Sequence, residues 1–256
     1  MPTNRATLDE LYSDRALPLI FGHRGASADA PMNTLPAFEL AVTQGADGIE
    51  LDVRLSKDRQ VIVIHDAQVD QTTDGHGAAA HKTLSELREL DAGSWFAPAF
   101  RNTRIPTLDE VFEAVGKRLF INVELKSETL RTDGLEQAVA DRIRHFGLAR
   151  RVIVSSFNPQ ALRRFCRLLP EVPVGFLYAP DVPRYLRLLA VGLRHAALHP
   201  HHSMINAAYV DWARKQNYRI HTWTVNEPAR ALTLRGLGVE ALITDSPRLL
   251  HETLRG

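Results

Sequence analysis

Short strand-like segments alternate with helix-like segments along almost the whole of this 256-residue chain. The strand-like segments are rich in β-branched and aromatic residues, and the helix-like segments carry the Pro, Thr and Gly signals of helix ends. Parallel strands need a long crossover, usually a helix, so the alternation predicts a parallel sheet. We expect eight strands, at residues 19–23, 48–53, 119–125, 152–156, 174–178, 197–199, 219–225 and 241–244.

Each expected strand is followed, directly or after an insertion, by a helix-like segment. The expected helices lie at about 34–44, from Thr107, at 134–146, at 159–169, after Pro183, at about 207–216, after Pro228 and at 247–254. Eight strand–helix units in about 250 residues are typical of an α/β protein with the (β/α)8 TIM-barrel fold. We therefore predict a single TIM-barrel domain over residues 1–256.

One further strand-like segment, Val61–His65, does not fit the eight units. Only the turn-like stretch 56–60 separates it from the second strand, which is too short for a parallel crossover. We expect it to be the returning arm of a hairpin that brings His65 back to the mouth of the barrel. Residues from about 66 to 104 then form a small insertion between the second and third barrel strands, with a helical pattern at 84–90.

The composition gives no bulk electrostatic reason to bind nucleic acid or an anionic membrane, because the net charge is only +1. The single cysteine, Cys166, permits no internal disulfide. The N-terminal segment has no apolar stretch of a signal peptide, and the longest apolar runs are far shorter than a membrane span. We expect a cytoplasmic protein without stable membrane insertion; the oligomeric state is not defined by these features.

Three acidic residues occupy strand positions where a barrel normally has aliphatic side chains. Glu50 and Asp52 lie in Gly-Ile-Glu-Leu-Asp-Val, and Glu124 lies in Phe-Ile-Asn-Val-Glu-Leu-Lys. Residues two apart in a strand share a face, so Glu50 and Asp52 point the same way, as do Glu124 and Lys126. Two carboxylates about 4 Å apart repel by about 4 kcal/mol at an effective dielectric constant near 20. Solvation at exposed strand ends is one alternative, but one divalent cation, Mg²⁺ or Ca²⁺, would offset the repulsion among all three acids.

Functional residues of such barrels come from the C-terminal ends of the strands, which form the mouth. Those ends carry His23, Arg24, Lys126 and the three acids. The hairpin brings His65 to the same place. Arg24 can bind a phosphate bidentately, Lys126 adds a positive charge, and two histidines can act as an acid and a base. Taken singly, these residues have structural explanations, such as a hydrogen-bonded histidine or a salt bridge. Together they favour metal-assisted cleavage of a phosphodiester.

A second group of residues, all histidines, is an alternative candidate for the metal site. It consists of His199, His201 and His202. Pro200 and the irregular spacing favour a solvent-facing loop over a metal site.

Several motifs occur in the order found in one known family. They are His23-Arg24-Gly25, residues 31–38, 48–53 and 64–66, Thr72-Thr73-Asp74-Gly75, residues 90–96 and 105–108, Glu124-Leu125-Lys126, Ser155-Ser156-Phe157, residues 222–226 and Ile243-Thr244-Asp245. With these motifs the sequence closely resembles the glycerophosphodiester phosphodiesterase family, over essentially the whole chain after about residue 18.

The resemblance implies a barrel whose metal is bound by Glu50, Asp52 and Glu124. It implies His23 and His65 as the acid/base pair. It also implies that Arg24 and Lys126 bind phosphate and that Trp223 packs on the glycerol side. The implied partner is a small molecule, because the family hydrolyses deacylated phospholipid headgroup diesters to glycerol 3-phosphate and an alcohol.

One position departs from the family pattern, which usually has Pro-Glu-Asn-Thr where this chain has Pro31-Met32-Asn33-Thr34. A thioether neither ligates a hard cation nor accepts a strong hydrogen bond from Arg24. Two alternatives to a glycerophosphodiesterase therefore stay open. One is a lysophospholipase D-like enzyme, with an apolar groove near Trp95, Phe96 and Phe100. The other is a catalytically weakened protein that binds phosphorylated glycerol compounds.

Overall fold

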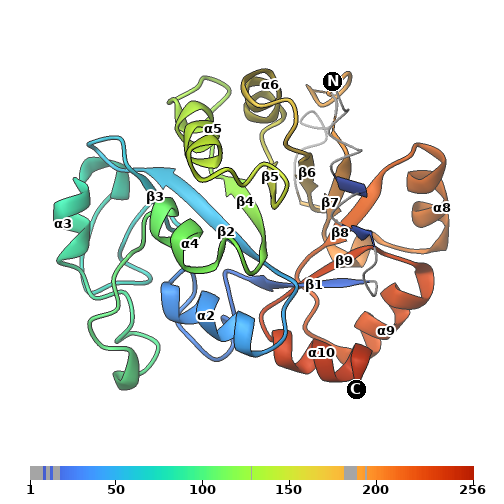
Figure 1. The fold of residues 1–256 in the computed structure, drawn as a ribbon, viewed down its shortest axis with the longest axis horizontal. Coiled ribbons are helices and arrows are strands. Elements are labelled where there is room, and N and C mark those ends of the chain that lie inside the picture. The colour runs from blue at the N-terminus through green and yellow to red at the C-terminus, as the bar shows by residue number, and fades with distance from the viewer. Residues whose placement is uncertain (1–7, 10–11, 14–17, 128, 182–188, 194) are drawn as a thin grey trace.

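A closed sheet of parallel strands forms the centre of the molecule (Figure 1). The computed structural model describes residues 8–9, 12–13, 18–127, 129–181, 189–193 and 195–256. The strands are β1 (Leu19–His23), β2 (Gly48–Leu55), β3 (Val61–Val63), β4 (Phe120–Leu125), β5 (Val152–Ser156), β6 (Val174–Tyr178), β7 (Ala197–Pro200), β8 (Arg219–Thr222) and β9 (Ala241–Thr244). They pair in the order β1-β9-β8-β7-β6-β5-β4-β2-β3, and β1 also pairs with β2. The eight strands other than β3 thus close a parallel barrel, and the predicted TIM-barrel fold is confirmed.

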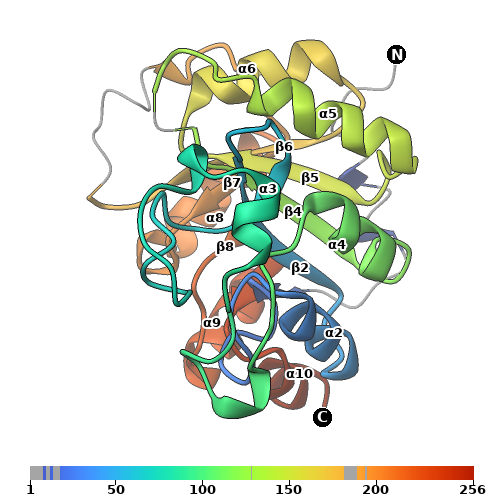
Figure 2. The ribbon, with the colours of Figure 1, turned by 90° about the vertical axis from the view of Figure 1, so that its left-hand side faces the viewer.

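Helices surround the barrel and cover the outer face of its strands (Figures 1 and 2). They are α2 (Leu35–Thr43), α4 (Leu108–Val115), α5 (Leu135–Phe146), α6 (Pro159–Leu168), α8 (Ala207–Lys215), α9 (Pro228–Leu237) and α10 (Pro247–Arg255). Several helices begin as the sequence indicates; Thr107 and Glu110, for example, form the expected capping box of α4. The helix expected after Pro183 falls on residues 182–188, outside the described residues.

One expected strand needs correction: the strand at 219–225 ends at Thr222 in the structure. Beyond Thr222 only a single bridge joins Trp223 to His201, and the Trp223 carbonyl accepts from the His202 backbone N–H. The backbone N–H of Val225 then donates a hydrogen bond to the carbonyl of Ile243 in the neighbouring strand. The expected strand is therefore three residues too long, because Val225 is buried in the core without being part of the strand.

The hairpin predicted after the second strand is confirmed. Strand β3 pairs antiparallel with β2, with Val63 opposite Val53 and Val61 opposite Leu55. The insertion that follows contains η1 (Ala79–His81), α3 (Leu84–Arg88) and η2 (Pro98–Phe100) and lies beside the barrel at β3 (Figures 1 and 2). It has a small apolar core of its own, formed by Ile62, Ile64, Val69, Ala79, Leu87, Ala92 and Ile105.

The barrel interior is apolar at the amino ends of the strands and polar at their carboxyl ends. Leu8 and Tyr12 pack among the first inward residues of the strands, including Phe21 and Phe120, and close that end. Glu50, Asp52 and Glu124 lie towards the other end, which is the mouth. No helix in the described parts of the chain is both long and apolar enough to span a bilayer.

Candidate active site

The loop after β1 presents His23 and Arg24 at the mouth because of a tight turn. Arg24 has the left-handed φ of 57°, and Gly25 follows with a φ of 89°. A side chain at Gly25 would lie 2.7–2.8 Å from the backbone carbonyl of Ala37, so only glycine permits helix α2 to approach so closely. The backbone N–H of Arg24 donates to Glu50 Oε2 at 3.1 Å, which ties the turn to β2.

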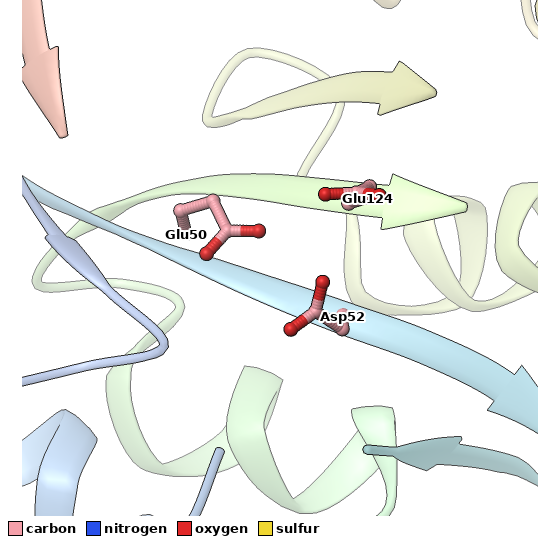
Figure 3. Close-up of side chains that lie close together, drawn as sticks. All are labelled: Glu50, Asp52 and Glu124. Carbon is pink, nitrogen blue, oxygen red and sulfur yellow. The ribbon is translucent and has the colours of Figure 1, made fainter. Parts of the chain in front are cut away.

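Three carboxylates from two neighbouring strands converge in the mouth. Glu50 and Asp52 come from β2 and Glu124 from β4, and Asp52 and Glu124 lie opposite each other in the strand register. Figure 3 shows the three side chains gathered in the space between these strands. One oxygen of each lies within 4.8 Å of the others, and the residues are only 1–7% exposed. The alternative of solvated acids at exposed strand ends is therefore wrong.

Basic and amide side chains surround this group, which is called here the carboxylate trio. Lys126 Nζ lies 3.0 Å from Asp52 Oδ1 and 2.6 Å from Glu124 Oε1. Arg24 Nε lies 3.3 Å from Asp52 Oδ2, and Asn33 Nδ2 donates to the same oxygen at 2.8 Å. Asp52 is thus fixed from three sides, whereas Glu50 accepts the Arg24 backbone N–H and lies 4.0 Å from His23 Nε2.

The pKa values of the trio show that two positive side chains do not balance its charge. Burial raises the pKa of Glu50 well above its ordinary value, and Asp52 and Glu124 raise it further. Burial also raises the pKa of Glu124, with Lys126 acting against it. Burial acts on Asp52 in the same direction, but Lys126 and Arg24 outweigh it and the pKa of Asp52 is lowered. The trio therefore favours additional positive charge.

The trio fits a divalent cation in donor type and in spacing. Mg²⁺ takes oxygen ligands at about 2.0–2.1 Å and Ca²⁺ at about 2.3–2.6 Å, so oxygens up to about 4–5 Å apart can share one ion. The 4.8 Å limit of the trio meets this requirement. In the described part of the chain no other cluster of His, Cys, Asp or Glu side chains does so. The competing histidine cluster is divided, because His199 is fully buried in β7.

Each of the two predicted catalytic histidines is held by a carboxylate through Nδ1. His23 Nδ1 lies 2.6 Å from Asp245 Oδ1, and His65 Nδ1 lies 2.8 Å from Asp66 Oδ1. Ser27 and Asn226 donate to Asp245 in turn. Burial lowers the pKa of His65. The carboxylates orient both rings and leave each Nε2 for another partner.

One cavity at the mouth of the barrel brings most of the predicted site residues together. Its polar lining comes from β1, β2, β4 and the segment after β3, and consists of His23, Arg24, Glu50, His65, Asn122, Glu124 and Lys126. Its apolar lining consists of Phe157, Leu177, Trp223 and Ile243. Trp223 is fixed by its indole N–H, which donates to the His199 carbonyl at 2.9 Å, and by an edge contact with Phe157. Asp52 lies behind this lining, in contact with Lys126.

Met32, the position that departs from the family pattern, lies at the guanidinium of Arg24. Arg24 Nη1 is 3.2 Å from Met32 Sδ. Met32 also lines a small side cavity with Ile64, His65 and Ala92. A thioether is a weak acceptor, so this contact leaves most of the hydrogen-bonding capacity of Nη1 unused.

Sequence reasoning gave no role to several residues that the structure brings to the site. Asp245 and Asp66 orient the histidines, Asn33 holds Asp52, and Asn122 lies in the cavity. Asp245 directly follows the last strand, a position that itself marks a barrel residue as functional. Asn122 precedes Glu124 by two residues and shares its face. Asn33 carries no such signal, because it lies in a loop.

Comparison with known proteins agrees with this geometry. The model of the glycerophosphoryl diester phosphodiesterase family matches residues 23–249. The chain belongs to the glycerophosphodiester phosphodiesterase family. It is accordingly a phosphoric diester hydrolase, as the residues at the mouth predict. A family member from Caldanaerobacter subterraneus subsp. tengcongensis, a glycerophosphodiester phosphodiesterase, is 38% identical over 238 residues, which cover 93% of this chain and 98% of the relative.

Solved structures of family members have the same fold. A phosphodiesterase from Oleispira antarctica, in complex with the product sn-glycerol-3-phosphate, superposes with a TM-score of 0.85 and 32% identity, over 96% of this chain and 99% of that one. The glycerophosphodiester phosphodiesterase of Agrobacterium tumefaciens gives a TM-score of 0.80 and 31% identity, over 92% and 100% of the two chains. The family therefore shares the barrel along nearly the whole length of both chains.

Proposed function

We propose that this protein hydrolyses glycerophosphodiesters to glycerol 3-phosphate and an alcohol, with one divalent cation bound by Glu50, Asp52 and Glu124. The observation that carries the proposal is one cavity lined by two acids of the carboxylate trio, with the third directly behind them, by two positively charged side chains and by two carboxylate-bound histidines. The Oleispira antarctica relative, 32% identical, holds sn-glycerol-3-phosphate as its product, which supports the same substrate class here.

The trio would hold Mg²⁺ or Ca²⁺ through carboxylate oxygens. When bound, such an ion polarises a phosphoryl oxygen and stabilises the charge that develops on it. Asn33 keeps the Asp52 carboxylate in place through two contacts, the 2.8 Å bond from its Nδ2 and the bond that its Oδ1 accepts from the Asp52 N–H.

Arg24 and Lys126 orient the phosphodiester. Both line the cavity, and both contact Asp52, so their charges lie next to the trio. Guanidinium and ammonium groups donate several hydrogen bonds to phosphate oxygens, and a low-dielectric site strengthens these contacts. The substrate is thereby held with its phosphorus between the two histidines.

His23 and His65 move the protons of the reaction at their Nε2 atoms. One ring takes the proton of the attacking water, and the other gives a proton to the oxygen of the departing alcohol. Asp245 and Asp66 accept the Nδ1–H bonds, which fix the tautomer and stabilise each ring when it is charged. An acid and a base are of no use to a protein that only binds, so this pairing favours an enzyme over the weakened binding protein.

A turnover assay with glycerophosphocholine tests this function. The protein is incubated with Mg²⁺ or Ca²⁺, and the products are separated. We expect glycerol 3-phosphate and choline in equal amounts, and turnover lowered by about 10²–10⁴-fold in the His23→Ala variant. Release of glycerol and phosphocholine, or no turnover with either ion, would contradict the proposal. A lysophospholipid offered in parallel tests the lysophospholipase D-like alternative.

A further inference from the structure

Asn122 has a buried side chain with two unused hydrogen-bonding atoms. The residue is 1% exposed and lines the active-site cavity. Neither its Nδ2 nor its Oδ1 has a hydrogen-bond partner in the described part of the chain. A buried polar group without a partner destabilises a protein, and such groups are rare in folded proteins. A ligand of the cavity is the partner that would remove this cost.

In the strand register Asn122 lies level with residues that already line the cavity, since Glu50 is the partner of both Asn122 and His23. It precedes Glu124 by two residues on β4 and lies opposite Glu50 in the strand register. The interior of such a barrel is normally filled with Val, Ile and Leu, which need no partner. Leu177 and Ile243 supply that kind of surface in the same cavity. Asn122 is therefore an uncharged polar side chain in a cavity that has both charged and apolar walls.

The chemistry of the amide selects the ligand group. An ionised phosphate offers acceptors but no donor, so it would leave Oδ1 without a partner, and Arg24 and Lys126 already serve it. A cation would use Oδ1 and leave Nδ2 without a partner. A hydroxyl group both donates and accepts, and two neighbouring hydroxyls satisfy a carboxamide at both atoms.

We propose that the Asn122 amide binds the two adjacent free hydroxyl groups of a glycerol end, with Nδ2 donating to one and Oδ1 accepting from the other. The inference rests on the proposed function and makes Asn122 the residue that determines which alcohol is recognised. The carbon atoms of the diol then pack on Leu177 and Trp223 in the same cavity. An acyl group on either hydroxyl removes a donor and adds bulk beside Asn122, so lysophospholipids are rejected.

Two phosphate monoesters test the diol contact by binding. Calorimetry with sn-glycerol 3-phosphate and with propyl phosphate compares ligands of similar size that differ in the two hydroxyls. We expect the wild-type protein, loaded with its cation, to bind the glycerol ester about tenfold or more tightly, since two neutral hydrogen bonds contribute about that factor. Equal affinities in the wild-type protein would overturn the proposal without any variant.

The variant Asn122→Leu keeps the volume and removes both polar atoms. We expect it to bind the two esters equally, to keep the wild-type affinity for propyl phosphate, and to titrate Mg²⁺ or Ca²⁺ as the wild-type protein does. Ser155→Ala is the matched control: Ser155 is also buried on an adjacent strand with a hydroxyl that has no partner among the described residues, but it does not line the cavity. It should keep the wild-type preference.

The other outcomes separate this inference from the proposed function. Weaker cation binding by Asn122→Leu, with equal losses for both esters, would make Asn122 a metal ligand and overturn the diol contact. An unchanged preference in that variant would also overturn it, while glycerophosphocholine turnover continued to support the function. Absence of that turnover would reject the function, and the two ester affinities would still decide whether Asn122 binds a diol.

Discussion

The guanidinium of Arg24 reaches Met32, with 3.2 Å between Arg24 Nη1 and Met32 Sδ. The sequence left two roles for a carboxylate at this position, as a metal ligand or as a partner of Arg24. The structure favours the second role, because the Met32 thioether lies at hydrogen-bond distance from the Arg24 guanidinium. Arg24 therefore has a weak acceptor on one side and Asp52 on the other.

Replacing Met32 by Glu is predicted to raise metal affinity or turnover on glycerophosphodiesters. A carboxylate would hold the Arg24 guanidinium with charge-assisted hydrogen bonds and would add negative charge near the trio. If about 1.4 kcal/mol is gained, the affected quantity rises by about tenfold. Metal titration and steady-state kinetics measure it, and Met32→Gln separates the charge from the shape. Unchanged or lower values of both quantities would show that methionine is adapted to another substrate.

The histidine pair predicts matched losses of turnover. His23→Ala and His65→Ala should each lower kcat by about 10²–10⁴-fold, the usual contribution of a general acid or base. Both rings are partly exposed at the mouth, so the free energy of unfolding should change little. Activity should depend on pH as a bell-shaped curve, with one limb lost in each variant. Wild-type turnover of His65→Ala at saturating substrate would remove His65 from the reaction.

Asp245 is predicted to act through His23. Burial favours its protonated form, but hydrogen bonds from His23, Asn226 and Ser27 outweigh burial and lower the pKa of Asp245. It therefore stays ionised well below neutral pH, and its support of His23 is lost only as the pH falls through that lowered value. Asp245→Asn should lower kcat by at least about tenfold and leave metal affinity unchanged. A loss confined to KM would instead indicate a contact with substrate.

Two buried histidines predict sensitivity to acid. Burial lowers the pKa of His199 to about 3, and that of His221 to about 3, from 6.5. The unfolded chain takes up these protons below pH 6.5 and the folded chain does not, so stability falls as the pH falls from 6.5 towards 3. Each histidine contributes a slope of about 1.4 kcal/mol per pH unit.

Urea unfolding at several pH values measures that slope. In His199→Leu the slope of unfolding free energy against pH should fall by the contribution of one histidine, about 1.4 kcal/mol per pH unit. His76 is exposed, so His76→Gln should keep the full slope. An equal pH dependence in all three proteins would show that other groups cause the acid sensitivity.

The barrel could be predicted from the sequence because its signals are local. Strand composition, helix caps such as Thr107, and the short turn before Val61 each depend on neighbouring residues, and they gave the topology and the hairpin. The trio could be predicted because residues two apart share a strand face, and because parallel strands end at one mouth. The predicted end of the strand at 219–225 was wrong because residue composition does not distinguish the last residues of a strand from those that follow it.

Other parts of the site depend on contacts between distant residues, which no local pattern specifies. Asp245 meets His23 across 222 positions, and Asn33 meets Asp52 from a loop with a left-handed backbone. The burial of His199 depends on Gly175 of the adjacent strand, whose missing side chain leaves room for the ring. The unused amide of Asn122 becomes visible only when all neighbours are in place.

The dependence of turnover on a divalent cation tests the central claim most directly. Protein stripped with a chelator should lose glycerophosphocholine hydrolysis and regain it when Mg²⁺ or Ca²⁺ is added back. Asp52→Asn should stay folded, bind the cation weakly and remain inactive after the same addition, since it lacks a charge of the trio. Hydrolysis by the stripped wild-type protein at the untreated rate would contradict a metal-dependent reaction at Glu50, Asp52 and Glu124.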